Sequence, residues 1–220
     1  MCRFLLIKSK KAIQPQTFIR EFSDMAEKSH TPDGDRQDDG WGVVWKNEQG
    51  EWNLHKSLLP VWKDTRSFHL IPKITLLVTH ARSASYQSQE GEISYNQPYI
   101  DKKRAFVFNG MLEGVSIRSP GTIGAQKIFQ LLKSDKTLDV NRTLQNLLVK
   151  LESHTKRIVG LNVGLGLVDI GVIAALCRYT KDSEYYTLWY SKMSKISFIC
   201  SEPIGTYEWR RMQNREIVVL

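Results

Sequence analysis

The chain has 220 residues, of which 41% are hydrophobic and 25% charged, a composition that is ordinary for a soluble globular protein. The formal net charge is +8, but the basic residues lie in short scattered groups, which argues against a nucleic-acid-binding face. The longest apolar stretch, residues 163–177, is interrupted by glycines and an aspartate and is too broken to span a membrane.

The three cysteines are too few and too widely spaced for a zinc cluster or a disulfide framework. Cys177 and Cys200 lie in apolar runs, so we expect core thiols at both positions. The amino terminus lacks the long apolar stretch of a signal peptide. These features predict a cytoplasmic protein with free thiols, and nothing in the sequence calls for a metal or a cofactor.

Hydrophobic periodicity predicts mainly strands in the first half of the chain. In chain order the expected elements are a strand at 2–8, a helix at 15–28, paired strands at 42–46 and 52–58, and strands at 74–80 and 104–108. Polar loops are expected at 30–39 and 86–98, and the strand at 104–108 is expected to end at Asn109-Gly110.

The second half is predicted to contain two helices and then strands only. In chain order these are helices at 123–133 and 140–153, and strands at 161–168, 172–179, 185–190, 196–200 and 217–220. This order favours an α+β protein whose helices pack on antiparallel sheets. No repeat or linker is apparent, so we expect a single domain spanning 2–220.

Cys2 is the first candidate for chemistry. A small residue after the initiator normally allows Met1 to be removed, which would leave Cys2 at the amino terminus with a free α-amino group. That group has a pKa of about 7.7–8.0 and is partly an unprotonated base at neutral pH. One residue could then supply both a nucleophile and its base. On its own, Cys2 is better explained as a small thiol buried in the first strand, so the case for catalysis depends on the rest of the chain.

Three further motifs stand at predicted strand ends, where loops expose side chains on a rigid support. Asp39-Gly40-Trp41-Gly42 indicates either a tight turn around a packed tryptophan or a close backbone approach. Arg82 could hold a carboxylate or form a surface ion pair, and nearby His80 is expected to orient other groups or pack in the core. Asn109-Gly110 could supply two oxyanion donors, or form a hairpin turn.

The order of these motifs closely resembles the class II glutamine amidotransferase domain, an N-terminal-nucleophile (Ntn) hydrolase with a cysteine nucleophile. The resemblance runs from Cys2 through the motifs above to Cys200-Ser201-Glu202-Pro203, and is strongest to the compact, stand-alone branch of the family. It implies a four-layer αββα sandwich of two antiparallel sheets flanked by helices. It also implies a γ-glutamyl thioester on Cys2 during amide hydrolysis or transfer.

The resemblance assigns a role to each candidate residue. The side chain of Asn109 and the backbone N–H of Gly110 match the oxyanion hole. Arg82 matches the arginine that grips the α-carboxylate of glutamine, and Ser85 matches a neighbouring hydroxyl position. Arg36 matches a loop residue that closes over the thiol.

Two positions depart from the family pattern. Gly124 stands where the family has the aspartate that binds the α-ammonium of glutamine, so we expect free glutamine to bind poorly unless another acid, Glu113 or Glu202, replaces it. Gln97-Pro98 replaces a His-Pro pair, which could alter the support of the loop.

Three hypotheses follow. The first is a cysteine amidohydrolase for glutamine or a γ-glutamyl compound, a small-molecule enzyme that could supply ammonia to a separate synthase subunit. The second is a catalytically impaired relative that serves as a binding or regulatory module. The third, a basic nucleic-acid-binding protein, requires a contiguous basic face that the sequence does not indicate. The first hypothesis involves neither nucleic acid nor membrane.

Overall fold

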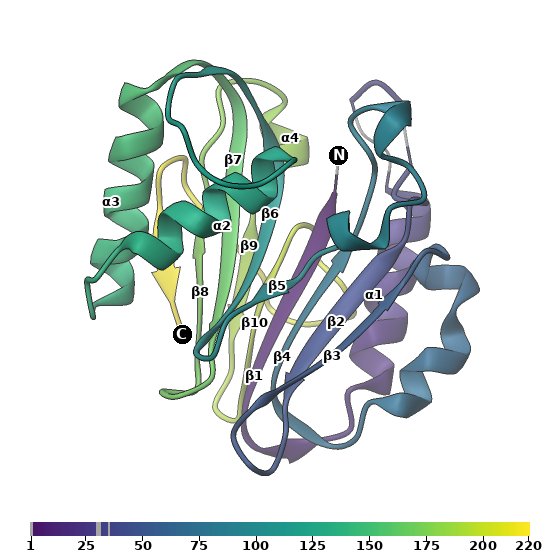
Figure 1. Cartoon of the computed structure of the whole chain (residues 1–220). Helices are drawn as coiled ribbons and strands as arrows, with labels where there is room; N and C mark the ends of the chain where they lie inside the picture. The colour runs from purple at the N-terminus through teal and green to yellow at the C-terminus, as the bar shows by residue number, and fades with distance from the viewer. Residues whose placement is uncertain (1, 30–31, 35) are drawn as a thin grey trace.

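The computed structural model describes residues 2–29, 32–34 and 36–220. Two antiparallel sheets pack face to face, and helices cover the outer face of each (Figure 1). This is the four-layer αββα sandwich that the sequence predicted. Within the described residues, no helix is both long and apolar enough to cross a membrane.

The larger sheet has seven strands in the order β11-β9-β10-β1-β4-β2-β3. Their bounds are β1 Arg3–Ile13, β2 Trp41–Lys46, β3 Trp52–Ser57, β4 Ile74–Ala81, β9 Trp189–Lys192, β10 Ile196–Cys200 and β11 Arg210–Arg211. Its outer face is covered by α1 (Gln16–Lys28) and by the 3₁₀ turns η1 (Val61–Lys63) and η2 (Thr65–Leu70). Strand β1 lies between β10 and β4, so the chain begins in the interior of the sheet.

The smaller sheet has five strands in the order β12-β8-β7-β6-β5. Their bounds are β5 Tyr99–Ile100, β6 Arg104–Val115, β7 Thr155–Leu167, β8 Val172–Leu176 and β12 Ile217–Val219. Helices α2 (Gly124–Ser134) and α3 (Val140–Ser153) pack on its outer face. The remaining short elements are η3 Gln87–Gln89, η4 Ile93–Tyr95 and α4 Ser183–Tyr186.

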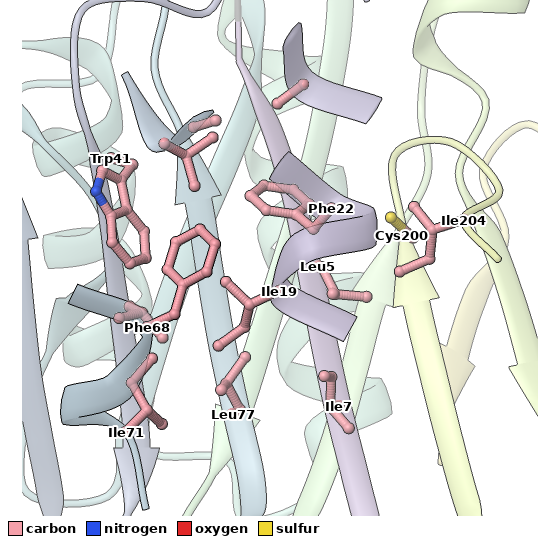
Figure 2. Close-up of a cluster of buried hydrophobic side chains, with 14 of the residues drawn as sticks. Leu5, Ile7, Ile19, Phe22, Trp41, Phe68, Ile71, Leu77, Cys200 and Ile204 are labelled. Carbon is pink, nitrogen blue, oxygen red and sulfur yellow. The ribbon is translucent and has the colours of Figure 1, made fainter. Parts of the chain in front are cut away.

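The layers follow from the period of two along each strand. In β1, Leu5 and Ile7 face α1 and pack with Ile19 and Phe22 (Figure 2). The alternate residues Phe4 and Leu6 face the other sheet, and they pack in one cluster with the inward-facing side chains of β6 and β8. A strand that is apolar on both faces must be covered on both, and β1 is covered by α1 on one face and by the smaller sheet on the other.

Most predicted elements are confirmed, with small shifts of their ends. The prediction that the strand ends at Asn109-Gly110 is wrong, and so is the hairpin alternative, because β6 continues to Val115 with Asn109 opposite Asn162 on β7. The predicted strand at 185–190 is wrong in its first half, since α4 contains Tyr185 and Tyr186 and β9 begins only at Trp189. Local apolar composition does not distinguish a buried helical turn from a strand.

Candidate active site

Cys2 directly precedes β1, at the end of the sandwich where α4 and the loop before α2 lie (Figure 1). It is only partly buried, in contrast to Cys177 and Cys200. Its backbone nitrogen donates to Oδ1 of Asn109 at 3.1 Å, and its Sγ lies 3.6 Å from the carbonyl oxygen of Ser83. The thiol therefore lies between the end of β4 and the middle of β6.

A cavity of about 350 Å³ opens beside Cys2, which is within the size range of small-molecule sites. Its wall contains all five residues that the sequence singled out for catalysis and substrate binding. They are Cys2, Arg82, Ser85, Asn109 and Gly110. The structure thus brings together the residue before β1, the loop after β4, and β6.

Asn109 is almost completely buried. Its Oδ1 accepts from the nitrogen of Cys2, whereas its Nδ2 has no hydrogen-bond partner among the described residues. A buried amide donor without a partner is costly, so water, a ligand or a transition state is expected to supply its acceptor. This geometry is compatible with an oxyanion donor next to the thiol.

The backbone N–H of Gly110 points away from β7. Leu161, its cross-strand neighbour, directs its own N–H to the carbonyl of Arg178, so Gly110 and Leu161 form a non-hydrogen-bonded pair. Strand β5 pairs with β6 only at Ala105 and Phe106. The N–H of Gly110 therefore lies on an edge of β6 that β5 does not reach. A Cβ at Gly110 would lie 2.1 Å from the carbonyl oxygen of Gly160, so no other residue fits there.

Arg82 is buried, and its guanidinium is held by backbone carbonyls. Its Nη2 donates to the carbonyl of Gln89 at 2.6 Å, its Nη1 donates to that of Asp39 at 3.4 Å, and the ring of Tyr95 lies 5.8 Å away. The Asp39 carboxylate accepts from the N–H of Ala84 at 2.6 Å. The loop after β4 is thereby fastened to the segment before β2, and Arg82 presents a positive charge to the cavity.

The glycines of Asp39-Gly40-Trp41-Gly42 permit close backbone contacts. Gly40 has φ +103°, and a Cβ there would lie 2.3 Å from Nδ2 of Asn96. At Gly42 a Cβ would lie 2.3 Å from the carbonyl oxygen of Gln97. Of the two alternatives for this motif, the close backbone approach is therefore present, together with a completely buried Trp41.

Gln97 supports β6 immediately before the candidate oxyanion hole. Its Oε1 accepts from the N–H of Phe108 at 2.6 Å, and its Nε2 donates to the carbonyl of Phe108 at 3.2 Å. The side chain thus takes the place of a strand partner where β5 has ended. The Gln97 side chain thus supplies a support for β6 that the sequence did not reveal.

A buried ionic cluster next to Cys2 was not predicted. The guanidinium of Arg3 pairs with Glu202, donates to Oγ of Ser29 at 2.7 Å, and stacks 3.7 Å over the ring of Tyr185. The hydroxyl of Tyr185 donates to the carbonyl of Cys2 at 3.4 Å. The only sequence signal for this cluster was the Cys200-Ser201-Glu202-Pro203 motif, whose partner residues lie far away in the sequence.

Three other predictions concern residues that lie outside the cavity. Arg36 donates to the carbonyl of Glu27 on α1 and lies 5.5 Å from the ring of Trp62, so it does not cover the thiol in this structure. Glu113 pairs with Arg157 on the neighbouring strand. His80 is completely buried, as expected, and burial lowers its pKa to about 3, so its ring is neutral at physiological pH.

Among the described residues, no group of three or more His, Cys, Asp or Glu side chains is arranged to hold a metal ion.

The chain has the fold of the class II glutamine amidotransferase domains. A structure described as a glutamine aminotransferase class-II domain protein from Silicibacter pomeroyi superposes with a TM-score of 0.66 at 14% identity, over 99% of this chain and 94% of that one. A predicted glutamine amidotransferase from Pseudomonas aeruginosa superposes with a TM-score of 0.59 at 16% identity, over 99% and 96%.

The glutamine phosphoribosylpyrophosphate amidotransferase of Bacillus subtilis matches with a TM-score of 0.70 at 14% identity, over 99% of this chain but only 47% of the enzyme. The chain therefore corresponds to about half of that enzyme. No protein-family model and no curated protein sequence matches the chain.

Proposed function

We propose that the protein is an N-terminal cysteine amidohydrolase that cleaves the side-chain amide of glutamine or of a γ-glutamyl compound. The observation that carries this proposal is the convergence of Cys2, Arg82, Asn109 and Gly110 on one cavity. The fold shared with class II glutamine amidotransferase domains supports the same reaction class.

In the first half of the reaction, Sγ of Cys2 attacks the carbonyl carbon of the γ-amide, and the thiol proton passes to the free α-amino group. Negative charge develops on the carbonyl oxygen, where Nδ2 of Asn109 and the N–H of Gly110 donate hydrogen bonds. One such donor is worth roughly 3–4 kcal/mol of barrier. The C–N bond then breaks, the protonated α-amino group returns the proton, ammonia or an amine departs, and a γ-glutamyl thioester remains.

In the second half, the α-amino group takes a proton from water, and the resulting hydroxide attacks the thioester carbon. The same two donors stabilise the second oxyanion. The C–S bond breaks, the sulfur regains its proton, and the γ-carboxylate product leaves. Arg82 holds the α-carboxylate of the substrate throughout, and Ser85 lies beside it.

This mechanism requires that Met1 be absent, because the nitrogen of Cys2 is not basic while it forms a peptide bond. Residues 2–220 are proposed to act as one glutaminase-type domain in the cytoplasm. The ammonia then passes either to solvent or to a separate synthase subunit, and a γ-glutamyl amine as substrate requires no such partner.

The test combines intact mass, covalent trapping and turnover. We expect the purified protein to lack Met1, to be labelled at Cys2 by a diazoketone analogue of glutamine, and to release ammonia from γ-carboxamides. Cys2→Ala should abolish both labelling and turnover while the circular dichroism spectrum stays unchanged. Retention of Met1, labelling elsewhere, or equal turnover by Cys2→Ala would instead favour a binding module.

A further inference from the structure

Among the described residues, the charged side chains that line the cavity are all basic. Arg82 and Lys127 both line the cavity, and none of the described residues that line it is Asp or Glu. Gly124 and Ala125, the first residues of α2, also line it, so the positive end of that helix faces the same space. The first turn of α2 contains no acidic residue. The cavity is therefore suited to an anion, and the described side chains that line it offer no carboxylate to a cation.

The two glutamates that could have supplied a negative charge lie outside the cavity wall. Glu113 pairs with Arg157, and Glu202 pairs with Arg3 on the other side of Cys2. At Gly124 itself the space is open, since an added Cβ would have no heavy atom within 4 Å. An ammonium group in this part of the cavity would lose water without gaining an acceptor of opposite charge.

The wall away from Cys2 is mostly apolar, with Ser119 and Lys127 as its polar members. It runs from the second half of β6, along the loop that follows, to the inner face of α2. Its aliphatic residues are Leu112, Val115, Ile117, Ile123, Ile128 and Leu131. An apolar substituent that occupies this part of the cavity favours binding, because its carbon atoms are removed from water.

We propose that the substrate is an α-N-acylated glutamine, whose α-nitrogen is an uncharged amide bearing an apolar acyl group. This inference rests on the proposed function and names the substrate class of the same site. The α-carboxylate is bound by Arg82, the γ-amide lies at Cys2, and the acyl group lies along the aliphatic wall. The reaction consumes one water and gives the N-acyl-glutamate and ammonia.

The first experiment compares ammonia release from L-glutamine, N-acetyl-L-glutamine and N-hexanoyl-L-glutamine by the wild-type protein. We expect kcat/KM for N-acetyl-L-glutamine to exceed that for L-glutamine by about ten- to a hundredfold, since the uncompensated ammonium is removed. The hexanoyl compound should be better still, because its chain reaches the aliphatic wall. A higher kcat/KM for L-glutamine would overturn the inference.

The second experiment restores the missing charge with Gly124→Asp. An aspartate fits the open space and suits the first turn of α2, so the variant should fold at least as well as the wild type. We expect it to raise kcat/KM for L-glutamine about tenfold and to lower that for the N-acyl compounds. Gly124→Asn has the same shape without the charge and should leave the preference unchanged. An unchanged preference in Gly124→Asp, or an equal shift in Gly124→Asn, contradicts the inference.

Covalent labelling separates the two levels of the proposal. The probes are 6-diazo-5-oxo-L-norleucine and its N-acetyl derivative, and the readout is the rate at which Cys2 is modified. Faster labelling by the N-acetyl probe supports the substrate class. Faster labelling by the free amino acid contradicts the proposed substrate class but still supports the proposed amidohydrolase activity. If neither probe modifies Cys2 and no amide is hydrolysed, the proposed function itself fails.

Discussion

The backbone nitrogen of Cys2 and Oδ1 of Asn109 form a 3.1 Å hydrogen bond between residues that are 107 positions apart. This bond fixes the orientation of the Asn109 amide, because the oxygen is engaged and the Nδ2 group must point elsewhere. The same side chain therefore positions the nitrogen proposed as the base and leaves its Nδ2 group, which has no partner among the described residues, as the proposed oxyanion donor. Both functions depend on one rotamer of one residue.

Asn109→Asp should separate these two functions. Aspartate keeps an acceptor for the nitrogen of Cys2 but loses the Nδ2 donor, so we expect kcat to fall by about 10²–10³ with a much smaller change in KM. Steady-state ammonia release measures this, and circular dichroism checks the fold. A variant with wild-type kcat would exclude Asn109 from the oxyanion hole.

The three thiols should differ sharply in reactivity. Burial raises the pKa of Cys177 to about 11 and that of Cys200 to about 12, whereas Cys2 is partly exposed beside the cavity. At pH 8 we expect a disulfide reagent to react rapidly with one thiol, and with the other two only after unfolding. Cys2→Ala should remove the rapid phase. A rapid phase that survives in this variant would show that a core thiol is accessible.

Gln97→Leu should damage both stability and catalysis. The substitution leaves the N–H and the carbonyl of Phe108 without their hydrogen-bond partner, which costs roughly 1–3 kcal/mol of folding free energy for each group. Since Asn109 follows Phe108 directly, kcat should fall more than substrate affinity. Urea denaturation and steady-state kinetics measure the two effects, with exposed Gln87→Leu as the control. Unchanged stability would mean that water or another group replaces Gln97.

The Arg3–Glu202 pair should be important for stability because the Arg3 side chain is only 2% exposed. Arg3→Met leaves Glu202 with the Ser29 hydroxyl but without its positive partner and removes the donor of the other Arg3 hydrogen bonds, so we expect a loss of about 3 kcal/mol. The double variant Arg3→Met/Glu202→Gln should be more stable than Arg3→Met alone, since the unpaired carboxylate is also removed. Additive losses in urea denaturation would show that the two residues do not interact energetically.

Lys56 should make stability depend on pH. Burial lowers its pKa to about 8, so between pH 8 and its unfolded value the folded chain binds fewer protons than the unfolded chain. The cost of burying the charge is thus fully present below pH 8 and fades as pH rises toward 10.5. Lys56→Met should be more stable than wild type at pH 7, with a difference that narrows over this range. Exposed Lys10→Met is the control, and a pH-independent difference would contradict the assignment.

Much of the architecture could be predicted because apolar alternation and helical spacing are local properties. The helix at 16–28 and the strand at 196–200 match their sequence patterns closely. Asn109-Gly110 shows the limit of local reasoning. Its sequence is typical of a turn. In the structure, however, both residues pair with β7 and remain within a long strand.

The sequence by itself determined the order of strands and helices, which follows from short-range periodicity, and the order of its motifs, whose resemblance to a known family pointed to the candidate nucleophile and the residues around it. Only the tertiary structure decided which of them meet. The registers of β1, β4 and β6 bring Cys2, Arg82 and Asn109 together and place Glu113 and Glu202 outside the cavity. Such contacts depend on how whole sheets pack, and residues far apart in the chain carry no local signal of them.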